Sequence, residues 1–189
     1  MRYVAFLRAI NTGNRRIKMV DLRGVYVDLG YTDAATYIAT GNVIFESDSR
    51  PDVSVLESAF EHAFGFHSEV FLRDEDEIKS VLARIPWSDA DGTVEVSFLE
   101  TIADTQAAQT LEATAAKPEA LSVSDSEVFF LREGNGAPTT HKESTSTRIL
   151  GMKMTRRGLS TVQKIYTKFL AEPVTPPEGD GDHNEEMDS

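Results

Sequence analysis

Cysteine is absent from the 189-residue chain, which excludes disulfides, cysteine-ligated metal sites and a thiol nucleophile. Long apolar runs are also missing. No stretch approaches the roughly 20 apolar residues that a membrane-spanning helix needs, and Arg8 interrupts the apolar run near the amino terminus. No small-residue cleavage site follows that run, as it would in a signal peptide. We therefore expect a cytoplasmic protein without membrane contact.

Recognisable metal and nucleophile motifs are missing too. The four histidines lack metal-binding spacing such as His-Glu-x-x-His; they are His62, His67, His141 and His183. His141 and Ser144 could be imagined as a base and a nucleophile, but no third group or elbow motif accompanies them. The sequence predicts neither a metal nor a cofactor.

Charge is plentiful but unevenly distributed. The formal net charge is -12. Nevertheless, residues 2–23 carry six basic side chains and one acid, and residues 142–168 carry seven basic side chains and one acid. If these two stretches meet in the fold, they form a cationic face on an acidic body. If they lie apart, they are ordinary surface charges.

Hydrophobic periodicity predicts a β-α-β-β-α-β order in the first part of the chain. Residues 3–7 are apolar at every position, which predicts a strand buried on both faces. Asp52 and Gly65 are placed to begin and end a helix. The remaining elements are predicted as a helix over 19–29, strands 37–38 and 43–45 around Gly41-Asn42, a helix over 53–64 and a strand over 69–73.

The same order is predicted again further along. Asp74 and Glu77 have the spacing of a helix capping box. The pattern then predicts strands over 93–99, 120–123, 128–131 and 152–156, and helices over 74–85, 104–115, 144–150 and 162–170. We therefore expect an α+β protein made of two tandem ferredoxin-like (split βαβ, α/β plait) units with extra helices.

The predicted organisation has three parts. Residues 1–73 form the first unit and residues 74–171 form the second, which includes the final helix. Residues 172–189 are rich in proline, glycine and acids. This composition predicts a disordered acidic tail.

In a ferredoxin-like unit, the end of the first strand, the start of the first helix and the central hairpin share one edge of the sheet. Arg8, Asn11, residues 12–18 and Gly41-Asn42 fall at that edge. Free helix amides beside arginine and lysine can hold an anion. A second cationic segment, residues 155–161, precedes the last helix. The alternative is that the glycines serve turns and the charges face solvent.

Three stretches resemble the bacterial domain-of-unknown-function family 1697: FLRAINTGNRRIKMVDLR, YIATGNVIF and TRRGLSTVQKI. In the third, Gly158 stands where the family pattern has asparagine. The resemblance extends from Met1 to about Leu170 and implies a duplicated ferredoxin-like fold without an established activity. The polar positions that match are Arg8, Asn11, Gly13, Lys18, Gly41, Asn42, Arg157 and Thr161.

These positions predict a module that binds a small anionic ligand or nucleotide in a cleft between the two units. Nucleic acid is the less favoured ligand because the net charge is strongly negative. One alternative is an enzyme of unknown reaction in which Arg8, Lys18 and Arg157 stabilise negative charge. Another is a protein-interaction module that uses the acidic tail.

Overall fold

The computed structural model describes residues 1–87, 91–134 and 141–171, and the predicted disordered tail lies outside them. The predicted α+β class is confirmed. None of the helices in the described ranges is long and apolar enough to cross a membrane. The first half of the chain comprises β1 (Arg2–Leu7), α1 (Met19–Asp28), β2 (Thr32–Thr36), β3 (Asn42–Glu46), α2 (Val53–Phe64), β4 (Val70–Asp74) and α3 (Glu75–Ala83).

The second half repeats this succession of elements. It comprises β5 (Gly92–Leu99), α4 (Thr105–Glu112), β6 (Glu119–Ser124), β7 (Glu127–Glu133), α5 (Glu143–Leu150), β8 (Met154–Gly158) and α6 (Leu159–Ile165), followed by a π-helical turn (Tyr166–Leu170). Each half builds a four-stranded antiparallel sheet, with strand orders β2-β3-β1-β4 and β6-β7-β5-β8.

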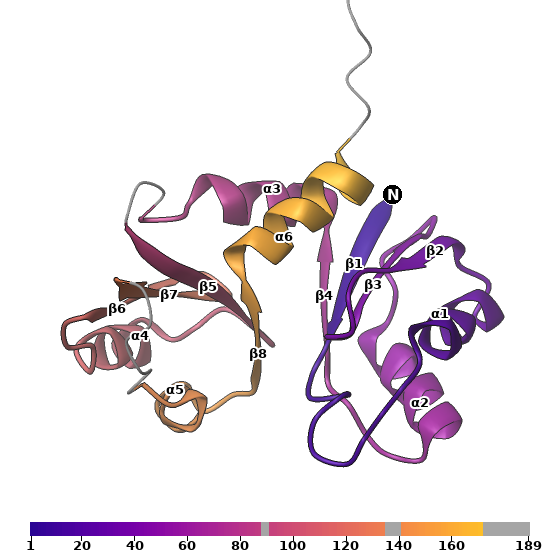
Figure 1. Ribbon diagram of the computed structural model, residues 1–189, viewed down its shortest axis with the longest axis horizontal. Coiled ribbons are helices and arrows are strands. Elements are labelled where there is room, and N and C mark those ends of the chain that lie inside the picture. Colours follow the sequence, from indigo (N-terminus) through magenta and orange to yellow (C-terminus); the bar gives the residue numbers. More distant parts are fainter. Residues whose placement is uncertain (88–90, 135–140, 172–189) are drawn as a thin grey trace, which may run out of the picture.

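Three hydrophobic clusters hold these elements together. One lies between the first sheet and α1 and α2, and another between the second sheet and α4 and α5. The third joins the facing sides of both sheets with α3 and α6, which lie next to each other above the sheets in Figure 1. Because this central cluster takes side chains from both sheets, the two halves share a core.

The sequence pattern explains how β1 contributes side chains to two hydrophobic clusters. Successive side chains of a strand point to opposite faces. Tyr3, Ala5 and Leu7 therefore enter the outer cluster, whereas Val4 and Phe6 enter the central one. This arrangement confirms the prediction of a strand buried on both faces.

Helix ends also follow local rules. The Asp52 side chain accepts a hydrogen bond from the Ser54 amide at the start of α2, and Gly65 ends that helix at φ 74°. Asp74 and Glu77 form the predicted capping box of α3.

The first hairpin differs from its prediction. We predicted a strand over 37–38, but β2 ends at Thr36 and Ile38 has a φ of 50°. Local apolar character was misleading here, because Tyr37 and Ile38 belong to the connection before β3. The amide of Tyr37 donates to the Asn42 carbonyl (3.1 Å), which closes the connection.

Among the described residues, the Tyr26 hydroxyl is buried without a hydrogen-bond partner in the cluster between the first sheet and helices α1 and α2. The side chain is 2% exposed, and its hydroxyl has no hydrogen-bond partner within the described residues. Burial raises the pKa of this phenol above its ordinary value. A buried polar group without a partner costs free energy that an apolar isostere does not.

We therefore expect Tyr26→Phe to raise the free energy of unfolding by up to about 1 kcal/mol. Urea denaturation checks this, with the partly exposed Tyr31→Phe as a control of little effect. A loss of stability in Tyr26→Phe would show that the hydroxyl has a partner and would contradict the prediction.

Candidate functional site

Arg157 connects the second half to the first from β8. Its Nε donates to the Asn42 side-chain oxygen (2.6 Å), and its Nη2 donates to the carbonyls of Leu7 (2.8 Å) and Thr40 (2.9 Å). Within its own strand, Nη1 donates to Thr155 Oγ1 (2.9 Å). The residue is only 7% exposed. All of its nitrogens therefore face protein partners rather than solvent.

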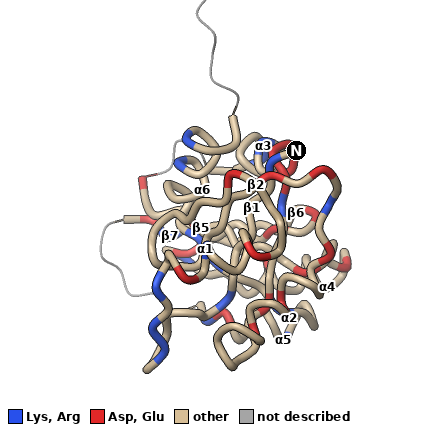
Figure 2. The backbone as a smooth tube through the Cα atoms, turned by 90° about the vertical axis from the view of Figure 1, so that its right-hand side faces the viewer, with Lys and Arg blue, Asp and Glu red and all other residues tan. Residues whose placement is uncertain are grey.

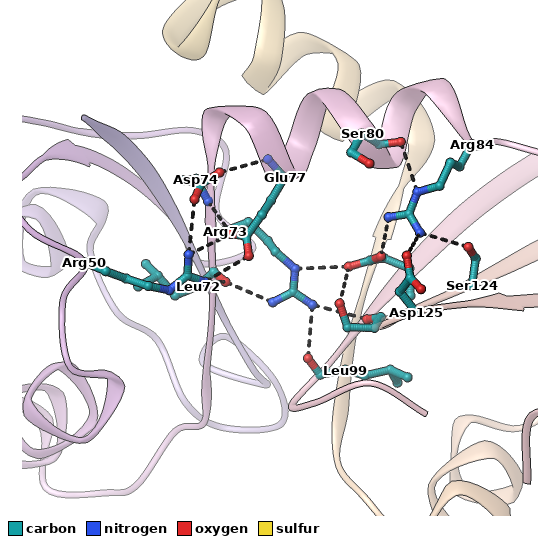
Figure 3. Close-up of polar contacts among 12 residues, drawn as sticks. Arg50, Leu72, Arg73, Asp74, Glu77, Ser80, Arg84, Leu99, Ser124 and Asp125 are labelled. Atoms are coloured by element: carbon teal, nitrogen blue, oxygen red, sulfur yellow. Dashed lines mark hydrogen bonds and ion pairs between the residues drawn. The ribbon is translucent and has the colours of Figure 1, made fainter. Parts of the chain in front are cut away.

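Arg73 makes the reciprocal connection from β4, as Figure 3 shows. Its Nε donates to Glu127 Oε1 (3.0 Å), and its Nη2 donates to the carbonyls of Leu99 (3.1 Å) and Ser126 (3.2 Å). Arg84 of the segment after α3 approaches the other oxygen of the same carboxylate at 3.0 Å. Each half thus contributes one buried arginine that donates hydrogen bonds to the ends of strands in the other half.

These two arginines occupy equivalent places in the repeat. Arg73 is paired with Val4 in the register of β1 and β4, and Arg157 is paired with Val96 in the register of β5 and β8. Their carbonyl acceptors, Leu7 and Leu99, are the last residues of β1 and β5. The halves are therefore joined by two related contacts in opposite directions.

Two stacked aromatic rings lie between the arginines. The Phe6 and Phe98 ring centroids are 4.2 Å apart with 9° between their planes. The Arg157 guanidinium lies 5.5 Å from the Phe6 centroid, and that of Arg73 lies 5.4 Å from the Phe98 centroid. The rings supply apolar and cation–π contact to both guanidinium groups.

The two junctions differ in charge. The carboxylate junction, around Arg73, contains the acid Glu127. The amide junction, around Arg157, has the neutral Asn42 in the corresponding contact. Burial lowers the pKa of Arg157 to about 10, so the group remains cationic at neutral pH. The amide junction therefore retains a positive charge that no directly bonded acid neutralises.

Asn42 is suited to this junction because an amide both donates and accepts. Its oxygen accepts from Arg157, while its nitrogen donates to the Tyr37 carbonyl (2.8 Å) and to Thr40 Oγ1 (3.0 Å). An aspartate could accept from the arginine but could not donate to Tyr37. The side chain thus ties the hairpin connection to β8.

Asn11 extends this network toward the surface. Its nitrogen donates to the Ala39 carbonyl (2.9 Å), and its oxygen accepts from the Ile17 amide (2.7 Å). Ala39 precedes Thr40, one of the acceptors of Arg157. A continuous set of contacts therefore leads from the amide junction to residues 12–18, which we call the basic loop.

The basic loop presents cations without acids. Arg15, Arg16 and Lys18 are exposed, and residues 9–20 contain no acidic side chain. The Arg15 guanidinium lies 4.1 Å from the Phe66 ring centroid, and Arg16 Nη1 donates to the Gly13 carbonyl (3.0 Å). None of the ion pairs in the described residues involves these three cations. In Figure 2 the loop forms the blue stretch of tube at the lower left edge of the molecule.

Arg8 lies at the boundary between the halves and has acidic partners. Its guanidinium is 3.3 Å from Glu143 of α5 and 3.6 Å from Glu69. Glu69 also pairs with Lys153 of the second half. Burial raises the pKa of Glu69, but the hydrogen bond from Lys153 and the positive charges nearby outweigh it and hold the pKa below its ordinary value. This surface cluster adds ionic contacts between the halves.

Comparison with known protein families shows which family the chain belongs to. A model of a family described as protein of unknown function (DUF1697) matches residues 1–129. The chain belongs to the DUF1697 family. The solved structure of a conserved bacterial protein from Streptococcus pneumoniae is similar, with a TM-score of 0.70 and 24% sequence identity over 88% of this chain and 97% of that one. Such a likeness shows the fold alone. No curated protein matches the chain.

The predicted positions of this DUF1697 protein have three different placements. Gly41, Asn42 and Arg157 meet in the amide junction, with Asn11 linked to them through the hairpin connection. Gly13 and Lys18 lie in the exposed basic loop. The remaining two lie apart, because Arg8 is paired with acids and Thr161, in the first turn of α6, has no hydrogen bond to the others.

The sequence reasoning missed the carboxylate junction. The sequence places Arg73 at the end of a predicted strand, and Glu127 just before the strand predicted over 128–131, with no link between them. Arg73 and Arg157 occupy corresponding strands of the repeat, which the register of the two sheets makes visible. The predicted strands did not reveal this match, because the strand predicted over 152–156 stops before Arg157, whereas β8 extends to Gly158.

Other chemical groups remain separate from these junctions. His141 contacts Ser146 (2.7 Å) rather than Ser144, and Ser146 is 1% exposed, so substrate cannot reach its hydroxyl. Desolvation and the charge of Arg156 lower the pKa of His141. Among the described residues, no group of three or more histidine or acidic side chains is placed to hold a metal ion.

We expect Arg157→Met to lower the free energy of unfolding by about 3 kcal/mol or more, because buried carbonyls lose their donor. Urea denaturation measures this loss. Arg156→Met, in the same strand but partly exposed, should cost less than about 1 kcal/mol. Equal stability of the two variants would show that the buried contacts of Arg157 contribute little.

Proposed function

We propose that this protein is a binding module for an anionic, phosphate-bearing ligand, and that the ligand binds the basic loop beside the junction of the two halves. One observation carries the proposal. Arg15, Arg16 and Lys18 are exposed, lack acidic ion-pair partners among the described residues and lie close together in a stretch, residues 9–20, that contains no acid. The negative net charge makes this local cationic surface unusual for the molecule.

The conformation of the loop suits phosphate binding. Arg15 rests against Phe66, which restrains the side chain while the edge of its guanidinium fork stays open. Arg16 uses Nη1 for backbone carbonyls, leaving Nε and Nη2 for a ligand. Guanidinium groups restrained in this way lose less conformational entropy on binding. They can form charge-assisted, bidentate bonds to phosphate oxygens.

We further propose that each half is a ferredoxin-like unit, with its sheet order supporting this assignment. In such a unit the loop after the first strand lies beside the central hairpin. The Asn11 contacts to Ala39 and Ile17 agree with that placement. Arg157 then has a supporting role: it holds the hairpin connection against which Asn11 positions the loop.

This proposal modifies the predicted cleft. Arg157 supports the site from its buried position, and its positive charge adds to the field at the loop. Arg8, whose side chain is about one-third exposed, borders the same region. A cytoplasmic location stays a prediction, as do the enzyme and interaction-module alternatives. The interaction-module alternative depends on residues 172–189, which lie outside the described residues.

The test compares thermal unfolding of wild type and Arg15→Ala/Arg16→Ala with inorganic phosphate, ATP and a short single-stranded oligonucleotide. A ligand at 100 times its dissociation constant stabilises a protein by about 2.7 kcal/mol. We expect at least one probe to raise the midpoint of wild type and to lose that effect in the loop variant. A steep loss of binding with salt would identify nucleic acid as the ligand class.

The matched control is Lys79→Ala/Lys164→Ala, which removes the same charge from exposed positions on α3 and α6. These helices lie at the end of the molecule opposite the connection from β1 to α1 (Figure 1). The control should keep the ligand effect. Equal loss in both variants, or no effect of any probe on wild type, would contradict the proposed site.

A further inference from the structure

We infer that a second site, independent of the proposed anion function, binds a neutral heteroaromatic ring of the nucleobase type beside Trp87. The pocket has a volume of about 380 Å³ and lies between the start of β5 and the start of α6. This volume is within the range of small-molecule sites. The starts of β5 and α6, which contribute its lining, lie away from the connection between β1 and α1 that contains the basic loop (Figure 1).

The lining of this pocket carries no charge. Its polar side chains are those of Thr93, Ser160 and Gln163, together with the Trp87 indole. The four other pockets described in this protein each include charged side chains. Thr93, Ser160 and Gln163 are exposed, so the pocket is open to solvent. In a chain that is 26% charged, a neutral lining favours a neutral ligand, since an ionised ligand would find no counter-charge there.

The polar groups of the lining are free to bind. Within the described parts of the chain, the side chains of Thr93, Ser160 and Gln163 make no hydrogen bond, and neither does the Trp87 N–H. Hydroxyl and amide groups can each donate and accept. They match the mixed donor and acceptor edges of a nucleobase, which a glutamine amide can bind with two hydrogen bonds.

Trp87 provides the surface for stacking. Its side chain packs against the central cluster on one side while it lines the pocket. A flat, partly buried indole can stack on a base with little loss of side-chain freedom, and stacking on aromatic side chains is a common mode of base recognition. The combination of an aromatic surface and neutral hydrogen-bonding groups favours a heteroaromatic ring.

Gly158 lines the pocket without contributing a side chain. Its backbone is extended (φ -63°, ψ 140°), and a Cβ atom added there would have no atom within 4 Å. The backbone therefore tolerates a side chain at this position, and the absence of one leaves space. Gly92, which also lines the pocket, differs because an added Cβ would come 2.3 Å from the Arg132 carbonyl oxygen.

Trp87 is the only tryptophan of the chain, so its fluorescence reports on this pocket directly. The test titrates adenosine and uridine, which carry no phosphate, into the full-length protein. We expect saturable quenching in wild type. Gly158→Leu, which adds a bulky side chain to the lining, should weaken binding by about tenfold or more. Gln163→Ala should weaken it by several-fold without changing thermal stability.

Three outcomes would overturn the inference: no saturable quenching by either nucleoside, the same affinity in Gly158→Leu as in wild type, or equal quenching by glucose. The basic-loop variant Arg15→Ala/Arg16→Ala should bind the nucleosides like wild type. The two tests are therefore independent. Failure of nucleoside binding beside Trp87 would not contradict anion binding at the basic loop, and failure of anion binding would not contradict nucleoside binding.

Discussion

The rest of the structure depends on one interaction, made twice. Each half buries one arginine against the strand ends of the other half. Arg73 and Arg157 are each only 7% exposed, and their donors satisfy carbonyls at the ends of β1 and β5. Buried carbonyls without donors are costly, and so are buried cations without acceptors. Each half therefore satisfies polar groups that the other cannot satisfy alone, and the stacked pair of Phe6 and Phe98 fills the space between them.

The difference between the two junctions links this architecture to function. Glu127 neutralises Arg73, whereas Asn42 leaves the charge of Arg157 in place. The junction without a directly bonded acid is the one that supports the hairpin connection, Asn11 and, through Asn11, the basic loop. The two halves repeat the same fold but differ in the charge of their junctions. The exposed basic loop is linked to the amide junction, which contains Arg157.

Local patterns were sufficient to predict many elements, because alternation, caps and periodicity act within a few residues. The double burial of β1, the Asp52 cap and the capping box of α3 are examples. The polar positions of the site were also recognisable, but the role of Arg157 was not. Its acceptors Leu7 and Asn42 lie 150 and 115 residues away in the chain, so its burial depends on packing between the halves. The error at residues 37–38 has a different, local cause: Tyr37 bonds to Asn42 to close the connection, and the apolar character of Tyr37 and Ile38 did not reveal this turn.

Urea unfolding followed by two signals tests the central claim that the halves form one cooperative unit through these junctions. Trp87 fluorescence reports on the central cluster, where α3 meets both sheets, and far-ultraviolet circular dichroism reports on the helices and sheets of both halves. If the junctions join the halves as described, both signals follow one transition with the same midpoint. Two separated transitions, with the secondary structure of one half lost before the fluorescence changes, would contradict this account.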